Sequence, residues 1–244
     1  MDKTISENKD NTDVTLLLGN EKHGSNTHNI LVERKFLPTV TDYNTLCLPF
    51  SLNSLAGTPY QGATILDFTG TTLQTIGEED ILVLNFTQVN AIEAGRPYLI
   101  QPNSDLGDSY TFSNISYSAV PEPTAKSVVQ EHATFHAVLN PGVVTVAADA
   151  PTLILVDQNR LALVSQNGEM KGLRGYFTLS PEMASVASNG RCYLSISKPA
   201  PTDIEVLTDP QPKARQQVQK IMRNGQIFII RDGETYTITG QKVR

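Results

Sequence analysis

The chain has 244 residues, of which 39% are hydrophobic and 18% are charged, so its composition is that of a globular protein with enough length to bury a large core. Its net charge of −6 argues against electrostatic binding to nucleic-acid phosphates. No stretch approaches the roughly 20 apolar residues that a membrane-spanning helix needs, so we expect no transmembrane segment.

The N-terminal residues 1–13 are polar and contain no hydrophobic signal core, which predicts a disordered N-terminus. A β-rich body is expected over residues 14–198. Its first apolar run is "YNTLCLPF" (43–50), in which Leu46, Leu48 and Phe50 would form one core-facing stripe and Cys47 would face the other way. The segment 52–57 is a candidate helical turn.

Apolar and polar residues alternate with a period of two across much of the body. Val, Ile, Thr, Tyr and Phe dominate these runs, while Gly, Pro, Asn and Asp separate them, which is typical of short antiparallel strands. The expected strands lie at 64–70, 80–89, 97–102, 111–120, 134–139 and 142–148. The sequence therefore predicts an all-β protein, an antiparallel β-sandwich or open barrel with one packed and one wetted face on each sheet.

Local signals place a hairpin, a short helix and an internal repeat. Residues 157–159 (Asp-Gln-Asn) suit a hairpin loop between two apolar runs. A short helix is expected after Ser180, with Pro181 at its first position and Asn189-Gly190 as a left-handed stop. The pattern Gly-Arg-x-Tyr-Leu occurs at both 95–99 and 190–194, which favours two similar β units that divide near residues 120–130.

A proline-rich linker is expected at 199–213, where four prolines occur. The segment 214–244 beyond it has Asn224-Gly225 and Asp232-Gly233 between apolar runs, which predicts a small C-terminal β-meander. Seven basic residues against two acidic ones make residues 213–244 a basic tail on an acidic body. Whether such a tail docks on the body, meets an acidic partner or is simply solvated stays open.

The two cysteines, Cys47 and Cys192, are expected to be buried and unpaired. Both lie in strand-like runs, and no nearby base or helix N-terminus would lower the pKa of the Cys47 thiol. A disulfide between the two cysteines, which needs Cα atoms roughly 4.4–6.8 Å apart, stays open as the alternative. His132 and His136 have the i, i+4 spacing of a helical metal site. In a strand, however, four residues span roughly 13 Å, which is too far for two imidazoles to share one ion, so no metal and no cofactor is expected.

Other ionisable residues give no recognisable catalytic motif. The acidic cluster at 77–81 fits a solvated turn or at most a weak calcium site. No Gly-x-Ser-x-Gly elbow and no phosphate-binding glycine loop occurs. Exposed aromatic platforms bind sugars, and Tyr60, Tyr110 and Tyr117 are the candidate ligand-binding tyrosines because they lie in polar or loop contexts. Ordinary core or surface roles remain the alternative for each of them.

The segments "YNTLCLPFSL", "GATILDFTG", "NFTQVNAIEAGRPYLIQP" and "LRGYFTLSPEM…NGRCYLSIS" resemble a recurrent β-rich module of exported and cell-surface proteins of Bacteroidetes. The likeness covers most of residues 30–198. The tail "NGQIFIIRDGETYTITGQKV" is similar to the C-terminal segments of such proteins. This resemblance implies an extracellular or cell-surface location, and a signal peptide that would have been removed from the protein. It implies no catalytic residue.

Two functional hypotheses follow from the sequence. The first is a non-enzymatic cell-surface module that acts as a structural, adhesive or interaction domain with an unknown protein or glycan partner. The alternative is a glycan-binding accessory module or, with less support, a hydrolase of glycans or peptides. Exposed tyrosines in a row would favour the alternative, and a polar cleft with perturbed acids would favour a hydrolase.

Overall fold

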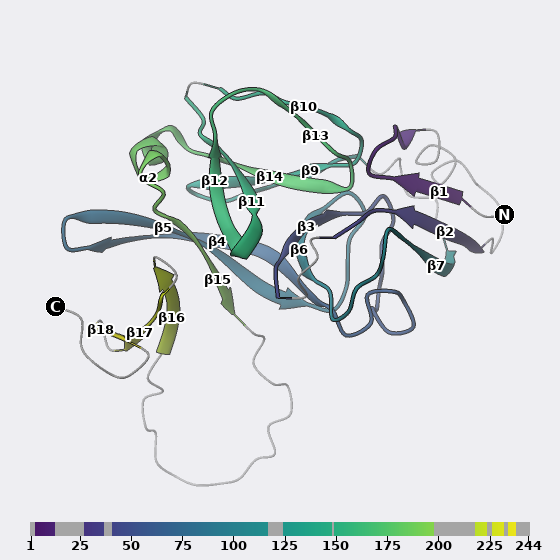
Figure 1. The fold of residues 1–244 in the computed structure, drawn as a ribbon, viewed down its shortest axis with the longest axis horizontal. Coiled ribbons are helices and arrows are strands. Elements are labelled where there is room, and N and C mark those ends of the chain that lie inside the picture. Colours follow the sequence, from purple (N-terminus) through teal and green to yellow (C-terminus); the bar gives the residue numbers. More distant parts are fainter. Residues whose placement is uncertain are drawn as a thin grey trace, which may run out of the picture. The chain divides into compact units, whose positions relative to one another are not determined.

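The computed structural model describes residues 3–12, 27–36, 41–116, 124–147 and 149–197, and the backbone of three strands between 218 and 237. It divides into two compact units, Met1–Ser197 and Lys198–Arg244. The chain is mostly β, as the alternating sequence pattern predicts, with a short helix among the described residues of the first unit (Figure 1).

The first unit is built around a central five-stranded sheet in the order β15-β5-β4-β6-β3. Its strands are β3 (Asn44–Cys47), β4 (Thr64–Ile76), β5 (Glu79–Val89), β6 (Pro97–Gln101) and β15 (Cys192–Ser197). The pair β15–β5 is parallel, and the other neighbours are antiparallel.

A second five-stranded sheet, entirely antiparallel, has the order β12-β11-β14-β9-β8. Its strands are β8 (Ser127–Val129), β9 (Ala133–Val138), β11 (Thr152–Val156), β12 (Arg160–Val164) and β14 (Arg174–Leu179). The loop between β11 and β12 is the single 3-10 turn Asp157–Asn159, where the sequence predicts it.

Two smaller sheets complete this unit. One has the order β1-β2-β7, with β1 (Lys3–Ser6) parallel to β2 (Thr27–Glu33) and β7 (Ser109–Ser116) antiparallel to β2. The other pairs β10 (Gly142–Val144) with β13 (Gly168–Met170).

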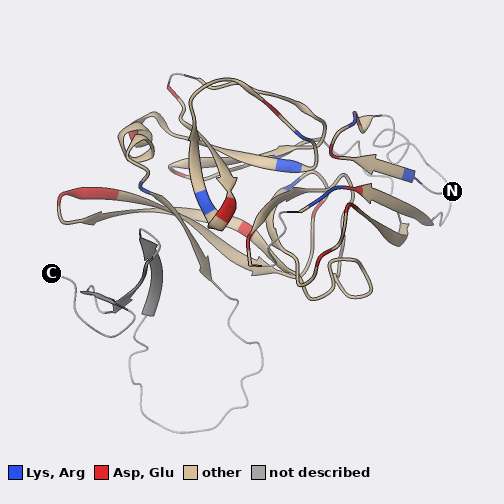
Figure 2. Ribbon diagram, viewed as in Figure 1, with Lys and Arg blue, Asp and Glu red and all other residues tan. Residues whose placement is uncertain are grey.

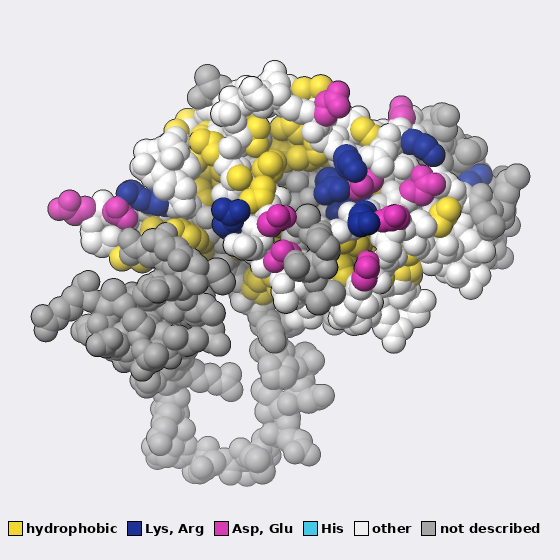
Figure 3. Space-filling view, in the orientation of Figure 1, with side chains coloured by type: hydrophobic (Ala, Val, Ile, Leu, Met, Phe, Trp, Pro, Cys, Tyr) yellow, Lys and Arg dark blue, Asp and Glu magenta, His cyan; other side chains and the backbone are white. Residues whose placement is uncertain are grey.

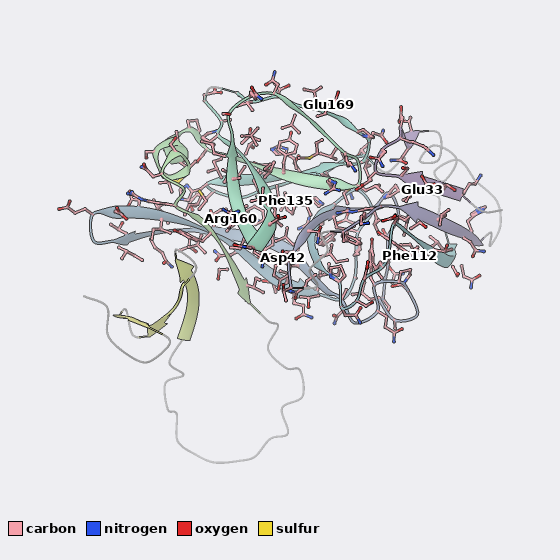
Figure 4. The ribbon with its side chains drawn as sticks, viewed as in Figure 1. Glu33, Asp42, Phe112, Phe135, Arg160 and Glu169 are labelled. Carbon is pink, nitrogen blue, oxygen red and sulfur yellow. The ribbon has the colours of Figure 1, made fainter. Side chains whose placement is uncertain are left out.

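The central sheet is covered on both faces. Leu66 and Leu99 point into one apolar cluster, which includes Phe135 of the second sheet. Their chain neighbours Ile65 and Ile100 point into another, which includes residues of β1, β2 and β7. Phe112 and Phe135, labelled in Figure 4, mark the two clusters. The expectation of one wetted face per sheet is therefore wrong for the centre of this sheet, because the second apolar face lies under a third layer.

The short helix forms where the sequence predicts it. The turn η2 (Pro181–Met183) leads into α2 (Ala184–Ser188), and its apolar side chains Met183, Val186 and Ala187 are buried in the cluster around Phe135. Gly190 ends the helix with φ of +66°. Ser180 occupies the N-terminal flanking position but makes no side-chain cap there, which corrects the role expected for it.

Residues 3–12 are ordered, although the sequence predicts disorder for this segment. Ile5 in β1 is fully buried, and Glu7 and Asn11 are also buried. The side-chain amide of Asn11 donates to the carbonyl oxygens of Ser6 and Leu139, both at 3.0 Å. A polar segment is thus ordered through specific hydrogen bonds to a distant part of the chain, which its own composition does not reveal.

Two other expectations differ from the structure. The segment 52–57 forms turns and one isolated bridge, not a helix. The two repeated segments become β6 and β15, which lie in one sheet and flank the β4–β5 pair on opposite sides. The repeat therefore contributes two strands to the same sheet and does not mark two separate units.

In the second unit, β16 (Val218–Arg223), β17 (Gln226–Arg231) and β18 (Glu234–Thr237) form an antiparallel sheet in that order. This confirms the predicted C-terminal meander and the strand expected at "VQKIM". The turn dipeptides 224–225 and 232–233 and the linker at 199–213 lie outside the described residues.

Candidate functional site

The outer face of the second sheet carries the most distinctive group of partly exposed side chains in the described chain. Phe135 and Phe177 point into the core, so strand alternation turns their neighbours His136, Tyr176 and Thr178 to the opposite face. Backbone pairing aligns Ser127, His136 and Tyr176 in one row across β8, β9 and β14. We call Ser127, His136, Tyr176 and Thr178 the outer-face row.

His136 is held by three neighbours in this row. Its Nδ1 lies 3.0 Å from Oγ of Ser127 and its Nε2 lies 2.8 Å from Oγ1 of Thr178. The imidazole also stacks on the ring of Tyr176, with centroids 4.9 Å apart and an interplanar angle of 21°. Both ring nitrogens are therefore hydrogen-bonded to hydroxyl groups, which fixes the orientation of the ring.

The electrostatics of the row favour a neutral histidine. Partial burial lowers the pKa of His136 from its usual 6.5, so the imidazole is uncharged at neutral pH. In a serine–histidine catalytic pair, a carboxylate stabilises the imidazolium that forms when the serine is deprotonated. Here a neutral hydroxyl, that of Thr178, takes the carboxylate's position. The geometry suits ligand contact through an aromatic face and hydroxyl groups better than nucleophile activation.

The same face is apolar toward β11 and β12. Leu153 faces the core, so its neighbour Ile154 faces outward, together with Ala162, with which Ile154 pairs. Val164 lies on the same side of β12 as Ala162, and all three outward side chains are partly exposed. Figure 3 shows hydrophobic side chains gathered in a hollow next to the β11–β12 hairpin, in the region of β9 and β14. A ligand with both apolar and hydroxyl-bearing surfaces would match this combination.

Two of the three candidate tyrosines are in the core. Tyr60 is fully buried and Tyr110 is nearly so, and their hydroxyl oxygens lie 2.9 Å apart. Phe36 stacks on Tyr110, and Phe112 makes edge-to-face contacts with both tyrosines. Burial raises the pKa of Tyr110 to about 12, and burial also raises the pKa of Tyr60 well above its usual 10. Neither ring is available as an exposed platform, which corrects that interpretation, and Tyr117 lies outside the described residues.

Both cysteines are buried and free, as the sequence predicts. Burial raises the pKa of the Cys47 and Cys192 thiols to about 12 each. Cys192 belongs to the cluster around Phe135, and Cys47 faces away from Leu46 and Leu48, which lie in the cluster around Phe112. Such thiols pack as small hydrophobic groups and are poor nucleophiles.

The remaining candidate residues make structural contacts. His132 precedes β9, and its Nδ1 lies 3.6 Å from Oε1 of Glu182. In the acidic cluster at 77–81, Glu79 pairs with Arg191 at 2.7 Å, and Asp80 accepts a hydrogen bond from Thr75. Among the described residues, no group of three or more His, Cys, Asp and Glu side chains could hold a metal ion.

A buried charge cluster joins distant strands. The carboxylate of Glu7 accepts hydrogen bonds from Lys171 at 2.8 Å and from Arg174 at 2.6 Å. Arg34 is buried, donates to the backbone oxygens of Leu173 and Thr45, and lies over the ring of Phe36 at 4.6 Å. These contacts fasten the segments after β1 and β2 to the loop before β14.

Tyr176 and the partners of His136 are not among the residues that the sequence predicts for a site. A signal was present, because in "RGYFTL" the core residues Gly175, Phe177 and Leu179 alternate with Tyr176 and Thr178. The pairing of β14 with β9 was not visible, since it joins residues 136 and 176, which are far apart in sequence.

Comparison with known proteins adds no further assignment. None of the described helices is long and apolar enough to cross a membrane. No protein-family model, no curated protein and no solved structure matches this chain, so the residues themselves carry the functional argument.

Proposed function

We propose that this chain is a non-enzymatic cell-surface module that acts as a structural, adhesive or interaction domain. The observation that carries the proposal is the outer-face row, in which an aromatic ring, a neutral imidazole and two hydroxyl groups lie together. Such a row provides contacts for a ligand, and the histidine within it contacts hydroxyl groups where an acid–base catalyst would contact a carboxylate. The cell-surface location rests on the resemblance of the segments around Cys47 and Gly95 to exported proteins.

The second candidate, a glycan-binding accessory module, is favoured by the chemistry of the same row. Sugars present apolar C–H faces to aromatic rings and hydroxyl groups to polar side chains. Tyr176 and His136 offer the rings, and Ser127 and Thr178 offer hydroxyl groups whose hydrogen-bond partners lie within the row.

The test is binding of the purified full chain to a glycan array and to a panel of extracellular matrix proteins. We expect binding to one class without chemical change of the ligand, and at least about tenfold weaker binding by Tyr176→Ala, the loss of roughly 1.4 kcal/mol. The matched control is Tyr193→Ala, because Tyr193 is also partly exposed but lies on β15 of the central sheet.

Each outcome has a distinct meaning. Binding to sugars that weakens with Tyr176→Ala supports the glycan-binding form of the proposal, and binding to protein supports the interaction form. Cleavage of a glycan or peptide that disappears in His136→Ala overturns the non-enzymatic function. Binding that weakens equally in both tyrosine variants removes the outer-face row from the proposal.

A further inference from the structure

The outer half of β4 has a free edge. β4 runs from Thr64 to Ile76 and pairs with β5 along its whole length, but on the other side it pairs with β6 only through Thr64, Ile65 and Leu66. In the described part of the chain, no strand pairs with that side of β4 beyond Leu66. The resulting β4–β5 hairpin extends from the body in Figure 1.

The backbone groups of this edge point outward at alternate residues. The N–H of Leu82 in β5 donates to the carbonyl of Arg191 at 3.0 Å, on the side of β5 away from β4. Leu82 faces Leu73 of β4, so this is a pair without hydrogen bonds between the two strands. The N–H and C=O groups of Leu73 therefore point away from β5, and those of Thr71 and Thr75 point the same way by alternation.

The free edge lacks the features that usually prevent strands from pairing with another chain. Residues 68–77 (FTGTTLQTIG) contain neither an ionisable residue nor a proline. Figure 2 shows the acidic residues of this hairpin at its tip. The bulge between Phe68 and Gly70 lies at the base, so the stretch from Thr71 to Ile76 is regular. Long, neutral and regular edges are pairing sites in β proteins.

Four other described edges, those of β12, β8, β3 and β7, are blunted. Arg160 is exposed on β12, and β8 has only three residues. The edge of β3 is engaged, because Cys47 donates its N–H to the carbonyl of Leu173 at 3.1 Å. Asn114, with φ of 56°, interrupts the edge of β7. The edge of β4 therefore differs from these four in being regular and, in the described chain, without a paired strand beyond Leu66. A contact that does reach it is from the N–H of His132 to Oγ1 of Thr71 at 3.3 Å.

We propose that this edge pairs with the same edge of a second copy of the chain. The stretch Thr71-Thr72-Leu73-Gln74-Thr75 is nearly symmetric about Leu73. Antiparallel pairing about a twofold axis at Leu73 places Thr71 of each copy opposite Thr75 of the other. The acidic tip at Glu78 then lies beside the base of the other hairpin and away from the other acidic tip.

A twofold pair of this kind is closed, because each copy uses its single β4 edge and none is left for a third copy. The contact is small, so the dimer is expected to be weak, with a dissociation constant in roughly the micromolar range. Its main attraction is backbone hydrogen bonding between neutral strands, which predicts little dependence on salt concentration.

The test is sedimentation velocity of the full chain over a series of concentrations. We expect the wild type to shift from monomer to dimer and Leu73→Lys to remain monomeric, because a lysine on a strand edge opposes pairing. The matched control is Leu163→Lys on β12, since the leucines are 40% and 43% exposed and the charge added is the same. Leu163→Lys is expected to dimerise like the wild type.

Hydrogen exchange on the wild type gives an independent readout that needs no variant. The amides of Leu73 and Thr75 are expected to exchange more slowly as the protein concentration rises, while the amide of Leu163 is unchanged. A wild type that stays monomeric at all concentrations, or a Leu73→Lys variant that dimerises normally, overturns the proposal. Loss of the dimer in Leu163→Lys alone overturns it in favour of pairing through β12.

Discussion

Gly95 donates its backbone N–H to the carbonyl oxygen of Leu48 at 2.7 Å. This bond joins the two most distinctive segments of the sequence, "NTLCLPF" and "AGRPYLI", which continue as the paired strands β3 and β6 with Cys47 opposite Pro97. Each of the two segments therefore supplies the pairing partner of the other.

Replacement of Gly95 by alanine is predicted to destabilise the protein strongly. Gly95 has φ of +74°, and a Cβ placed there would lie 2.2 Å from the carbonyl oxygen of Thr124. Gly57 is the matched control, because its φ is +73° and nothing lies within 4 Å of its Cβ position. We expect Gly57→Ala to lower the free energy of unfolding by about 1–2 kcal/mol, because of backbone strain. Gly95→Ala should lower it by about 1–3 kcal/mol more, because of the clash. Urea unfolding measures the free energy of unfolding of both variants, and an equal loss of stability in the two would contradict the steric argument.

The hydroxyl pair of Tyr60 and Tyr110 is predicted to stabilise the core. Tyr60→Phe keeps the ring but leaves the buried hydroxyl of Tyr110 without this partner, which we expect to cost about 1–2 kcal/mol. Tyr176→Phe is the control, since its ring is partly exposed and the loss should stay within about 0.5 kcal/mol. A neutral effect of Tyr60→Phe in chemical denaturation would show that the hydroxyl pair adds no stability.

The buried carboxylate of Glu7 is predicted to make stability depend on pH in the acidic range. Burial alone would raise its pKa, but the hydrogen bonds from Lys171 and Arg174 and the charge of Arg174 outweigh burial, so the pKa lies below the usual 4.5. The folded state therefore holds the proton less tightly than the unfolded state. This contribution is complete above about pH 4.5 and is lost as pH falls through the lowered pKa.

The variant Glu7→Gln measures that contribution. At pH 7 we expect it to lower the free energy of unfolding by about 3 kcal/mol or less, because Arg174 and Lys171 lose a buried partner but remain partly exposed. The difference in free energy of unfolding between wild type and variant should become smaller as the pH is lowered below 4.5. A gap that stays constant from pH 7 to below 4.5 would exclude the charge of Glu7 as its origin.

The two thiols are predicted to resist alkylation in the folded protein. A pKa of about 12 for Cys47 and Cys192 leaves few thiolates at pH 8, roughly a thousandfold fewer than for an unperturbed thiol. Mass spectrometry after iodoacetamide treatment should find both unmodified in native buffer and both modified in urea. Rapid labelling of either one in native buffer would show that its strand opens frequently.

Strand alternation in the sequence was sufficient for part of the fold. The runs at 64–70, 80–89 and 97–102 became β4, β5 and β6, and the residues 157–159 formed the predicted hairpin loop. These features depend on contacts between residues close in sequence, where side-chain period and turn geometry decide the conformation. The same local signals located the C-terminal meander.

The contacts of the outer-face row cannot be predicted from such local signals. His136 and Tyr176 could each be placed on a strand, and alternation indicates that each faces away from its phenylalanine neighbour. Their stacking depends on β9 pairing with β14, which joins residues 40 positions apart in sequence. Covariation across many related sequences could reveal such a pairing, whereas one sequence cannot.

By itself, the sequence determined that the chain forms short strands, that its cysteines are apolar packing residues and that its C-terminal segment is a meander. Only the tertiary structure decided that Tyr60 and Tyr110 are core residues, that residues 3–6 form an ordered strand and that His136 contacts Tyr176. The physical reason is that alternation defines which side chains share a face of a strand. Whether that face is covered, and by which residues, depends on contacts between segments that are distant along the chain.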